Sequence, residues 1–366
     1  MKKSEEVQDI PKGTSWTIDV TVLDKINKIS TNRPNSAELV QKTQFDVKKL
    51  LNIAEEHFLQ GNFIETARIF RSLGRIIRNL EYNIEFKGKY SEKNQLNDLT
   101  GKEWLRHTKS WMIVDGKPSD LPYEIKDHPA SFPPELAKHF IRFFTKRDEK
   151  NWVFDPFMGV GSTLTAAKEL NRNCWGIELN KKYADYARKR VINNESKNNT
   201  YYIANDDSHN CKKIFMEQGF PSADLLLTSP PYWNILAESR GGVKSTLKQR
   251  VENGYDETYG TDSRDLGNIP QYNQYLDELV SLFFDFCEII KDHGYIVVIL
   301  QNVRPADSKM RPLAWEFALK FSEHPNIVLK QEFIWLQDQK FMGIWGYPYS
   351  YVSNVHHHYC LVFQKE

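Results

Sequence analysis

The sequence has few cysteines, no long apolar run and almost no net charge, and each shortage excludes a class of protein. Successive cysteines are separated by 37, 76 and 73 residues, which fits no zinc-ligand spacing. We therefore expect reduced, apolar thiols in a cytoplasmic protein. No uncharged apolar run approaches the ~18 residues of a membrane helix, and the opening MKKSEEVQDIPKG lacks the apolar core of a signal peptide. Because the net charge is only +1, binding to a polyanion would require locally concentrated positive charge.

Composition and apolar spacing predict an appendage followed by a larger domain. The 366 residues are 40% hydrophobic and 27% charged, which is typical of a chain with a packed core. Residues 1–35 form a polar segment. Residues 36–96 are predicted to form a helical hairpin, broken near Gly61, whose apolar positions are Val40, Val47, Leu51, Ala54, Phe58, Ile69, Leu73, Ile76 and Leu80. One tetratricopeptide-like hairpin cannot bury its own apolar face, so we expect it to dock on a neighbour.

Residues 97–366 are predicted to form an α/β domain. After a connector over residues 84–127, strand-like runs alternate with helical stretches from about His128 onward. The predicted strands are Trp152–Asp155, Cys174–Glu178, Tyr201–Ala204, Asp224–Thr228, Tyr295–Leu300, Ile327–Leu336 and Tyr359–Gln364. The predicted helices are Leu164–Leu170, Lys181–Val191, Tyr272–Lys291 and Leu313–Ser322. This alternation predicts a mostly parallel sheet with helices on both faces, which binds ligands at the carboxyl ends of its strands.

A glycine loop follows the first of these strands. In NWVFDPFMGVGSTLTAAKEL, Gly159 and Gly161 allow a tight turn and close approach of a ligand, and Ser162 or Thr163 can cap the next helix. Glu178 ends the following strand, where a carboxylate can accept both hydroxyls of a ribose. Leu164 stands where the dinucleotide fingerprint has a third small residue, so the loop alone also fits a tight turn in any α/β fold.

A second motif, TSPPYW at residues 228–233, ends another predicted strand. The lone pair of an exocyclic amino group on a nucleobase is delocalised into the ring, and acceptors around its N–H bonds can free it. Ser229 offers a hydroxyl oxygen and Pro230 a carbonyl oxygen, while the proline pair makes the corner rigid. Tyr232 offers a flat face for an extruded base. An ordinary strand-terminating turn is the alternative.

Together the motifs resemble those of the S-adenosylmethionine-dependent DNA amino-methyltransferases of restriction–modification systems, over roughly residues 97–366. FDPFMGVGS resembles their cofactor loop and TSPPYW their catalytic tetrapeptide with its flanks. HPASFPPEL resembles the segment that closes over the methionine end of the cofactor, NDDSHN the loop near its adenine, and SNVHHHYCLVFQK the last strand. The resemblance implies a Rossmann-like methyltransferase sheet, mostly parallel, with a helical N-terminal appendage.

The resemblance also implies the partners and the site. The cofactor is S-adenosyl-L-methionine, the substrate is a base flipped out of double-stranded DNA, and no metal takes part. A separately encoded restriction endonuclease is a further candidate partner. The implied catalytic residues are Ser229, Pro230, Pro231 and Tyr232. The implied cofactor-binding residues are His128, Pro129, Phe132, Asp155, Pro156, Phe157, Gly159, Gly161, Ser162, Thr163, Glu178, Asp207 and Ser229.

The serine of the tetrapeptide favours cytosine-N4 as the methylated position, whereas Asp or Asn there would point to adenine-N6. A hydroxyl does not by itself select the base, so adenine-N6 stays open. An RNA or protein-glutamine methyltransferase would share the aromatic proline corner. A dinucleotide-dependent oxidoreductase would share the fold and Glu178 but has no use for TSPPYW, and a non-catalytic DNA-binding module would need a vestigial cofactor loop.

Two basic clusters are predicted to contact DNA, although each also fits a solvated surface. The first, in the 234–270 loop after the catalytic strand, is Arg240, Lys244, Lys248 and Arg250. The second, on one face of the second predicted helix, is Arg68, Arg71, Arg75 and Arg78. Gly161 and Thr228 lie only 67 residues apart, so no recognition domain is expected between them. The three histidines at 356–358 are expected to be structural, because consecutive strand residues point to opposite faces.

Overall fold

The computed structural model describes residues 37–83, 90–114, 132–147, 150–192, 199–233, 262, 264–305, 309–337, 347–349 and 351–366, with the backbone alone for residues 37–46, 75–83 and 192. The chain divides into two compact units, residues 1–85 and 86–366. The sequence placed this boundary after residue 96, because residues 86–96 are mostly polar and give no apolar pattern.

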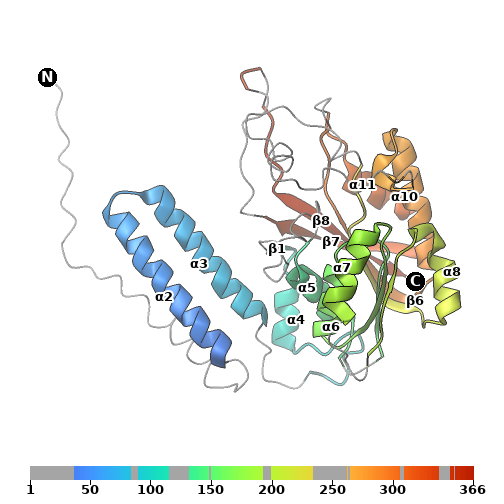
Figure 1. The fold of residues 1–366 in the computed structure, drawn as a ribbon, viewed down its shortest axis with the longest axis horizontal. Helices are drawn as coiled ribbons and strands as arrows, with labels where there is room; N and C mark the ends of the chain where they lie inside the picture. The colour runs from blue at the N-terminus through green and yellow to red at the C-terminus, as the bar shows by residue number, and fades with distance from the viewer. Residues whose placement is uncertain are drawn as a thin grey trace. The chain divides into compact units, whose positions relative to one another are not determined.

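The first unit is a helical hairpin, drawn in blue in Figure 1. Its helices are α2 (Ala37–Leu59) and α3 (Phe63–Asn83). Gly61 makes the turn between them with φ +73°, a conformation that glycine adopts readily. Val47 and Ala54 of α2 form a small buried core with Ile69 and Leu73 of α3. The predicted hairpin and its apolar spacing are therefore confirmed over the side chains that the structure describes.

The second unit is built on an eight-stranded sheet in the order β1-β7-β8-β6-β5-β2-β3-β4. The strands are β1 (Trp111–Ile113), β2 (Trp152–Asp155), β3 (Asn173–Ile177), β4 (Tyr201–Ala204), β5 (Ala223–Thr228), β6 (Ile290–Leu300), β7 (Ile327–Leu336) and β8 (His357–Lys365). Strand β8 runs antiparallel to both its neighbours, and the other pairs are parallel. The predicted mostly parallel sheet is thus confirmed.

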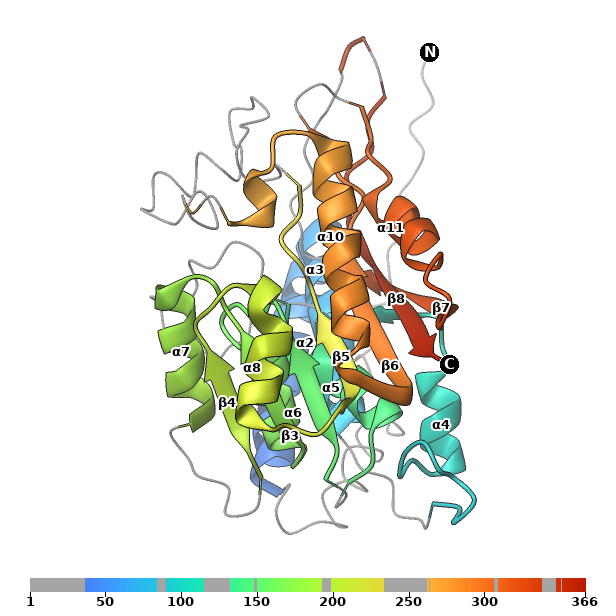
Figure 2. The same ribbon diagram turned by 90° about the vertical axis from the view of Figure 1, so that its right-hand side faces the viewer.

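Helices cover both faces of this sheet, as predicted (Figures 1 and 2). They are α4 (Gly101–His107), α5 (Pro134–Phe144), α6 (Ser162–Glu169), α7 (Lys181–Ile192), α8 (Cys211–Gln218), α10 (Tyr272–Cys287) and α11 (Leu313–Phe321). Neighbouring residues of β2 enter different cores because strand side chains alternate. Val153 packs in the core that contains α5, α6 and α7, and Phe154 in the core that contains α8, α10 and α11. All four cysteines are free and buried, as expected.

Three helices and one strand of this unit were not predicted. Helix α5 starts at a proline pair, with Pro133 at its N-cap and Pro134 at its first position, where proline is well tolerated. Its Leu136 and Phe140 are fully buried. Helix α8 was not recognised between two strands, and α4 and β1 lie inside the segment predicted to be a connector. Three residues of β1 are too few to show an alternating pattern.

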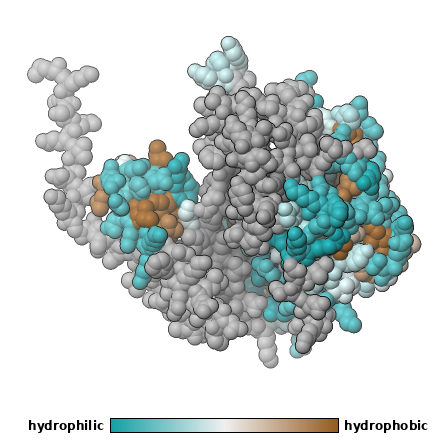
Figure 3. Space-filling view, in the orientation of Figure 1, coloured by the Kyte–Doolittle hydropathy of each residue, from teal (hydrophilic) through white to brown (hydrophobic). Residues whose placement is uncertain are grey.

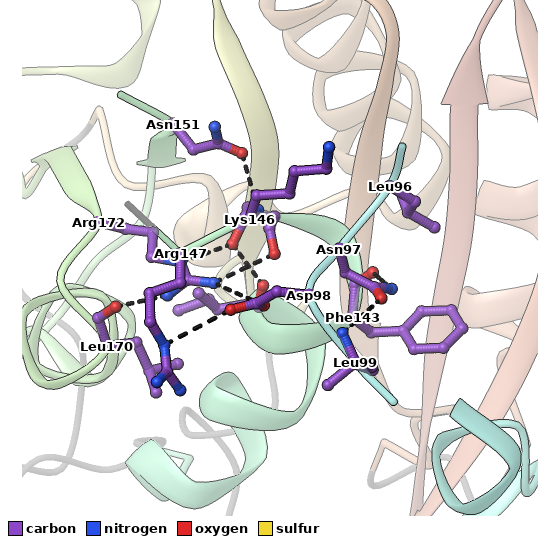
Figure 4. Close-up of polar contacts among 12 residues, drawn as sticks. Leu96, Asn97, Asp98, Leu99, Phe143, Lys146, Arg147, Asn151, Leu170 and Arg172 are labelled. Atoms are coloured by element: carbon purple, nitrogen blue, oxygen red, sulfur yellow. Dashed lines mark hydrogen bonds and ion pairs between the residues drawn. The ribbon is translucent and has the colours of Figure 1, made fainter. Parts of the chain in front are cut away.

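Polar contacts bind the segment before α4 to the rest of the unit (Figure 4). The side chain of Asn97 donates a hydrogen bond to the carbonyl of Phe143 at 2.7 Å. The buried guanidinium of Arg172 donates to the Thr145 hydroxyl at 3.0 Å and lies 3.8 Å from a carboxylate oxygen of Asp98. These contacts connect α5 with the turn between α6 and β3, at the end of the sheet where β2 begins.

Candidate active site

A cavity of about 390 Å³ opens at the carboxyl ends of β2, β3 and β5. Strand β2 lies between β3 and β5 in the sheet. The strand order reverses at this point, since β3 and β4 follow on one side of β2 and β5 on the other, and ligands bind at such a switch point. The cavity is lined by Pro156, Phe157, Ile177, Glu178, Leu179, Asn180, Lys181, Tyr183, Asp207, Ser208, His209, Ser229, Pro231, Asp262, Arg264, Asp265, Leu266 and Leu282. The two sequence motifs therefore meet around one hollow.

The glycine loop borders this cavity through Pro156 and Phe157, and its backbone conformation favours glycine at two positions. Gly159 and Gly161 have φ of +53° and +80°. A Cβ at Gly161 would lie 3.0 Å from the Cβ of Ala187 on α7, so the loop and α7 approach closely there. The backbone N–H of Gly159 donates to Oε2 of Glu178 at 2.9 Å. The loop and the acidic strand end are thus joined directly.

The predicted capping of α6 is wrong. Gly161 is the N-cap, and no side chain makes a capping hydrogen bond. Thr163 is fully buried and its hydroxyl donates to the carbonyl of Leu227 at 3.3 Å, so it ties α6 to β5. Ser162 is also buried. The left-handed glycine already turns the chain into the helix, and the Thr163 hydroxyl is directed to β5 instead of to the start of the helix.

Leu164, which replaces the third small residue of the dinucleotide fingerprint, has a structural explanation. Leu164 is fully buried in α6, opposite Gly176 of β3. A Cβ at Gly176 would lie 3.1 Å from Cδ1 of Leu164 and 2.9 Å from the sulfur of Met158. The close approach of helix to strand, which the fingerprint obtains with a small residue on the helix, is obtained here with a glycine on the strand.

Glu178 places a half-buried carboxylate in the cavity wall. Oε2 accepts from Gly159, and Oε1 accepts from the N–H of Asn180 at 2.7 Å. Burial raises the pKa of Glu178 to about 7, and the two backbone donors oppose part of that shift. Each oxygen of a carboxylate can accept more than one hydrogen bond. Glu178 can therefore still receive two hydroxyl donors from the cavity side.

Asp155 acts from beneath the loop. Its Oδ1 accepts from the N–H of Phe157 at 3.1 Å and from the hydroxyl of Thr228 at 2.6 Å. Burial raises the pKa of Asp155 to about 6, against the effect of its hydroxyl and amide donors. This side chain links the ends of β2 and β5, the two strands that carry the glycine loop and the TSPPYW corner.

The loop after β4 adds a hydrogen-bonded histidine that sequence reasoning missed. Asp207 caps the short helix η3 (Ser208–Asn210) and lines the cavity. The ring of His209 bridges Asp207, at 2.6 Å, and Glu278 of α10, at 2.8 Å. Partial burial lowers the pKa of His209, but the hydrogen bonds to Glu278 and Asp207 outweigh it and leave the pKa raised. The loop is therefore fixed against α10.

A further wall comes from the stretch before α10, which lies within the predicted active-site loop at residues 234–270. Asp265 caps the short helix η4 (Leu266–Asn268) by accepting from the N–H of Gly267 at 2.9 Å. Arg264 and Asp262 form an exposed ion pair at 2.6 Å, and the hydrogen bonds from Arg264 lower the pKa of Asp262 to about 2. The individual roles of these three residues were not predicted, because they form no recognised motif.

At the TSPPYW corner, two hydroxyls share one acceptor. The Ser229 hydroxyl donates to the carbonyl of Ile299 on β6 at 3.1 Å, and the Tyr232 hydroxyl donates to the same carbonyl at 3.3 Å. The two hydroxyl oxygens are themselves 3.3 Å apart. The hydroxyl of Tyr275 donates to the carbonyl of Pro231 at 2.7 Å. The corner is therefore held by the neighbouring strand and by α10.

The ring of Tyr232 differs from the expected placement. It is 7% exposed, packs in the core and does not line the cavity. Burial raises its pKa. The ring lies 6.3 Å from that of His358 on β8. In this conformation Tyr232 presents no open face to the cavity, because its hydroxyl is drawn to the carbonyl of Ile299. Ser229 and Pro231 are the parts of the corner that reach the cavity.

The remaining predicted residues divide into three groups. Phe132, Asp155, Gly159, Gly161, Ser162 and Thr163 are described but do not line the cavity. His128, Pro129, Arg240, Lys244, Lys248 and Arg250 lie outside the described residues, as do the side chains of Arg75 and Arg78. Arg68 pairs with Glu65 at 2.9 Å, and Arg71 is exposed on α3.

The three histidines near the C-terminus lie on or beside β8. His358 is buried and its ring stacks on Trp335 with centroids 4.5 Å apart, and the carbonyl of His357 accepts from the side chain of Gln301. Over the described part of the chain, no group of three or more potential ligands is arranged to hold a metal. No helix in the same residues is long and apolar enough to cross a membrane.

Comparison with known proteins agrees with this geometry. Residues 18–189 match the sequence model of the N6/N4 methylases, which is described as a DNA methylase family. Over these residues, which are fewer than half of the 366, the chain is similar to the N6/N4 DNA methylases. The matched region includes the glycine loop and Glu178 and ends before the TSPPYW corner.

Curated relatives match over shorter stretches. The orphan methyltransferase M.BamHII of Bacillus amyloliquefaciens is 32% identical over 120 residues, which cover 30% of this chain and 44% of that protein. The type II methyltransferase M.SmaI of Serratia marcescens is 40% identical over 65 residues, which cover 18% of this chain and 22% of that protein. The chain thus spans less than half the length of these relatives. A SAM-dependent methyltransferase structure from Agrobacterium tumefaciens covers 63% of the chain, and 60% of its own length is matched, with 13% identity and a TM-score of 0.37, a likeness too distant to bear on function.

Proposed function

We propose that this chain transfers a methyl group from S-adenosylmethionine to the N4 amino group of a cytosine flipped out of duplex DNA. The match of residues 18–189 to the N6/N4 methylase model and a cavity at the switch point of the sheet support the proposal. The observation that carries it is the hydroxyl of Ser229. Ser229 lines the cavity, and its hydroxyl donates a hydrogen bond to the carbonyl of Ile299.

The residues of the cavity fit a nucleoside cofactor. Its volume of about 390 Å³ lies in the range of small-molecule sites. Glu178 supplies a carboxylate for the ribose hydroxyls, and Asp207 supplies a second carboxylate one loop further on, for the adenine amino group. Gly159 and Gly161 keep the loop beneath the cofactor free of side chains. When bound, the cofactor supplies a methyl group on a positively charged sulfur, and the protein supplies position and hydrogen bonds.

The corner prepares the amino group as a nucleophile. Because the Ser229 proton is directed to Ile299, the serine oxygen faces the cavity as an acceptor. One N–H of the base would donate to this oxygen and the other to the carbonyl of Pro230, which does not itself line the cavity but lies between the two residues of the corner that do. These two bonds would orient the lone pair of the nitrogen towards the bound cofactor and would stabilise the positive charge that develops on nitrogen, which then loses one of its protons to water.

Cytosine is favoured because the acceptor is a serine, which is the form the cytosine-N4 branch shows. Adenine-N6 is the second candidate, since the family model covers both positions. Methylation of an amino group in RNA is a third and weaker reading, because the family and the curated relatives are DNA methylases. The type II relatives also support a restriction endonuclease as a companion of this protein.

Contact with DNA is assigned to two basic groups. Arg240, Lys244, Lys248 and Arg250 follow the catalytic corner in the sequence and are proposed to contact phosphates beside the flipped base. Arg68, Arg71, Arg75 and Arg78 are proposed as a second phosphate-contacting row on α3. The ion pair of Arg68 with Glu65 is exposed, so it costs little to exchange for a phosphate.

The test is to express the chain in a host that lacks DNA methylation and to sequence the genomic DNA for modified bases. We expect N4-methylcytosine at one recurring short sequence, and none when Ser229→Ala is expressed at the same level. Detection of N6-methyladenine instead would change the methylated base from cytosine to adenine and leave the rest of the proposal unchanged. Unmodified DNA from a well-expressed, folded protein that binds S-adenosylhomocysteine would overturn the proposal.

A further inference from the structure

Three tyrosines between β7 and β8 are almost fully exposed. The exposed fractions of Tyr347, Tyr349 and Tyr351 are 80%, 95% and 91%. Tyrosine has a large apolar ring and is usually partly buried in a monomer, so three such rings within five positions are unusual. The turn at residues 347–349 stands clear at the top of Figures 1 and 3 and lies beyond the ends of both strands in Figure 2.

The strands on either side of these tyrosines, β7 and β8, are connected to the TSPPYW corner by hydrogen bonds and ring contacts. At the base of the loop, the N–H of Gln337 donates to the carbonyl of His356 at 2.8 Å. The side chain of Gln301, which directly follows β6, donates to the carbonyl of His357 at 2.7 Å. The ring of His358 lies between those of Trp335 and Tyr232, at 4.5 and 6.3 Å. The loop therefore leaves the sheet beside the active site, at the same edge.

The chemistry of this edge suits a nucleic acid. No acidic residue occurs from Gln339 to Lys365. The neighbouring loop after β6 contributes Arg304, Lys309 and Arg311 against a single acidic residue between positions 301 and 312. A polyanion with flat aromatic bases and many hydrogen-bonding groups matches exposed tyrosines beside positive charge. An acidic or apolar protein surface would match only one of these two properties.

We propose that Tyr347, Tyr349 and Tyr351 form a DNA-contacting surface that holds the duplex beside the target base. This inference rests on the proposed function, because the duplex is the substrate of the same site. The rings pack against bases or sugars, and the hydroxyls donate to phosphates or base edges. Their position beside the corner places these contacts on nucleotides that flank the extruded base, so they contribute to the choice of sequence.

The test compares Tyr349→Ala/Tyr351→Ala with the wild-type chain and with Tyr90→Ala. Tyr90 is 48% exposed. It precedes Asn97 and Asp98, whose contacts to Phe143 and Arg172 lie at the end of the sheet where β2 begins. DNA affinity is measured by fluorescence anisotropy with a short labelled duplex that carries the methylated sequence read from the host genome. Cofactor affinity is measured by calorimetry with S-adenosylhomocysteine.

We expect the double variant to bind the duplex about tenfold more weakly, since two side chains lose their hydrogen bonds and ring contacts to phosphates, sugars or base edges, each worth several-fold in affinity. Its affinity for S-adenosylhomocysteine and that of Tyr90→Ala for both ligands should stay within about twofold of wild type. Wild-type DNA affinity in a double variant that keeps its cofactor affinity overturns the inference. So does self-association of the wild type that the double variant loses while DNA binding is unchanged, because the surface is then a protein interface. If the wild type methylates no DNA at all, the proposed function fails instead, and the two failures are distinguishable.

Discussion

Replacing Ser229 by alanine removes the acceptor on which the proposed chemistry depends. The lost bond is one made to an amino nitrogen that becomes positively charged, and such charge-assisted bonds contribute about 1.5–3 kcal/mol. We therefore expect kcat to fall about ten- to hundredfold. Folding should change less, by about 0.5–1.5 kcal/mol, because the carbonyl of Ile299 keeps the hydroxyl of Tyr232 as a donor at 3.3 Å.

The assay is transfer of labelled methyl groups to duplex DNA, together with calorimetry for S-adenosylhomocysteine and urea unfolding. A matched control is Ser322→Ala, because that hydroxyl also donates to a backbone carbonyl, the one of Ala318 at 2.7 Å, at the end of α11. The control should lose a similar amount of stability and no activity. Equal losses of activity in Ser229→Ala and Ser322→Ala, or a full loss of cofactor binding in the first, would refute the reasoning and make Ser229 a structural residue.

Three further perturbations test other parts of the molecule. Gly161→Val should abolish binding of S-adenosylhomocysteine by calorimetry, because a side chain there meets α7; Gly219→Ala, at φ +63° in open space, is the control and should bind normally. Because the pKa of Glu178 is raised to about 7, its carboxylate is protonated as the pH falls below 7, and the affinity for S-adenosylhomocysteine should drop about tenfold between pH 8 and pH 6. Glu178→Gln should bind more weakly and show no such pH dependence. The same pH dependence in that variant would exclude Glu178 as the titrating group. Arg172→Met should cost about 3 kcal/mol in urea unfolding, since it leaves buried acceptors and a carboxylate without their cation; Arg147→Met, whose side chain is 42% exposed, should cost less than about 1 kcal/mol, and equal costs would contradict this account of the cluster.

The sequence was informative where chemistry demands particular residues in a particular order. Strands β2, β4 and β7 were predicted with their observed bounds, and the buried parallel strand β2 is the continuous apolar run that such strands form. The glycine loop and the TSPPYW corner were placed correctly at strand ends because glycine and proline have strong backbone preferences. Topology then brings the two motifs together without any further signal.

Other parts of the site depend on tertiary contacts that no local pattern records. His209 reaches Glu278 across 69 positions of the chain, and Ser229 reaches Ile299 across 70. The burial of Tyr232 could not be predicted, because it follows from an acceptor on a neighbouring strand. The predicted cap on α6 was wrong for a related reason, since Thr163 found a partner in β5 instead of in its own helix.

The short strand β1 has a practical consequence for handling this protein. It pairs with the last residues of β7, Trp111 with Ile334 and Ile113 with Leu336, and so shields a flank that would otherwise offer unpaired N–H and C=O groups to another chain. A shortened version that starts after residue 113 would keep both motifs but bare that flank, and exposed flanks of this kind recruit strands from other molecules. Expression of the second unit by itself should therefore begin at or before residue 86, ahead of the polar contacts around Asp98, if aggregation is to be avoided.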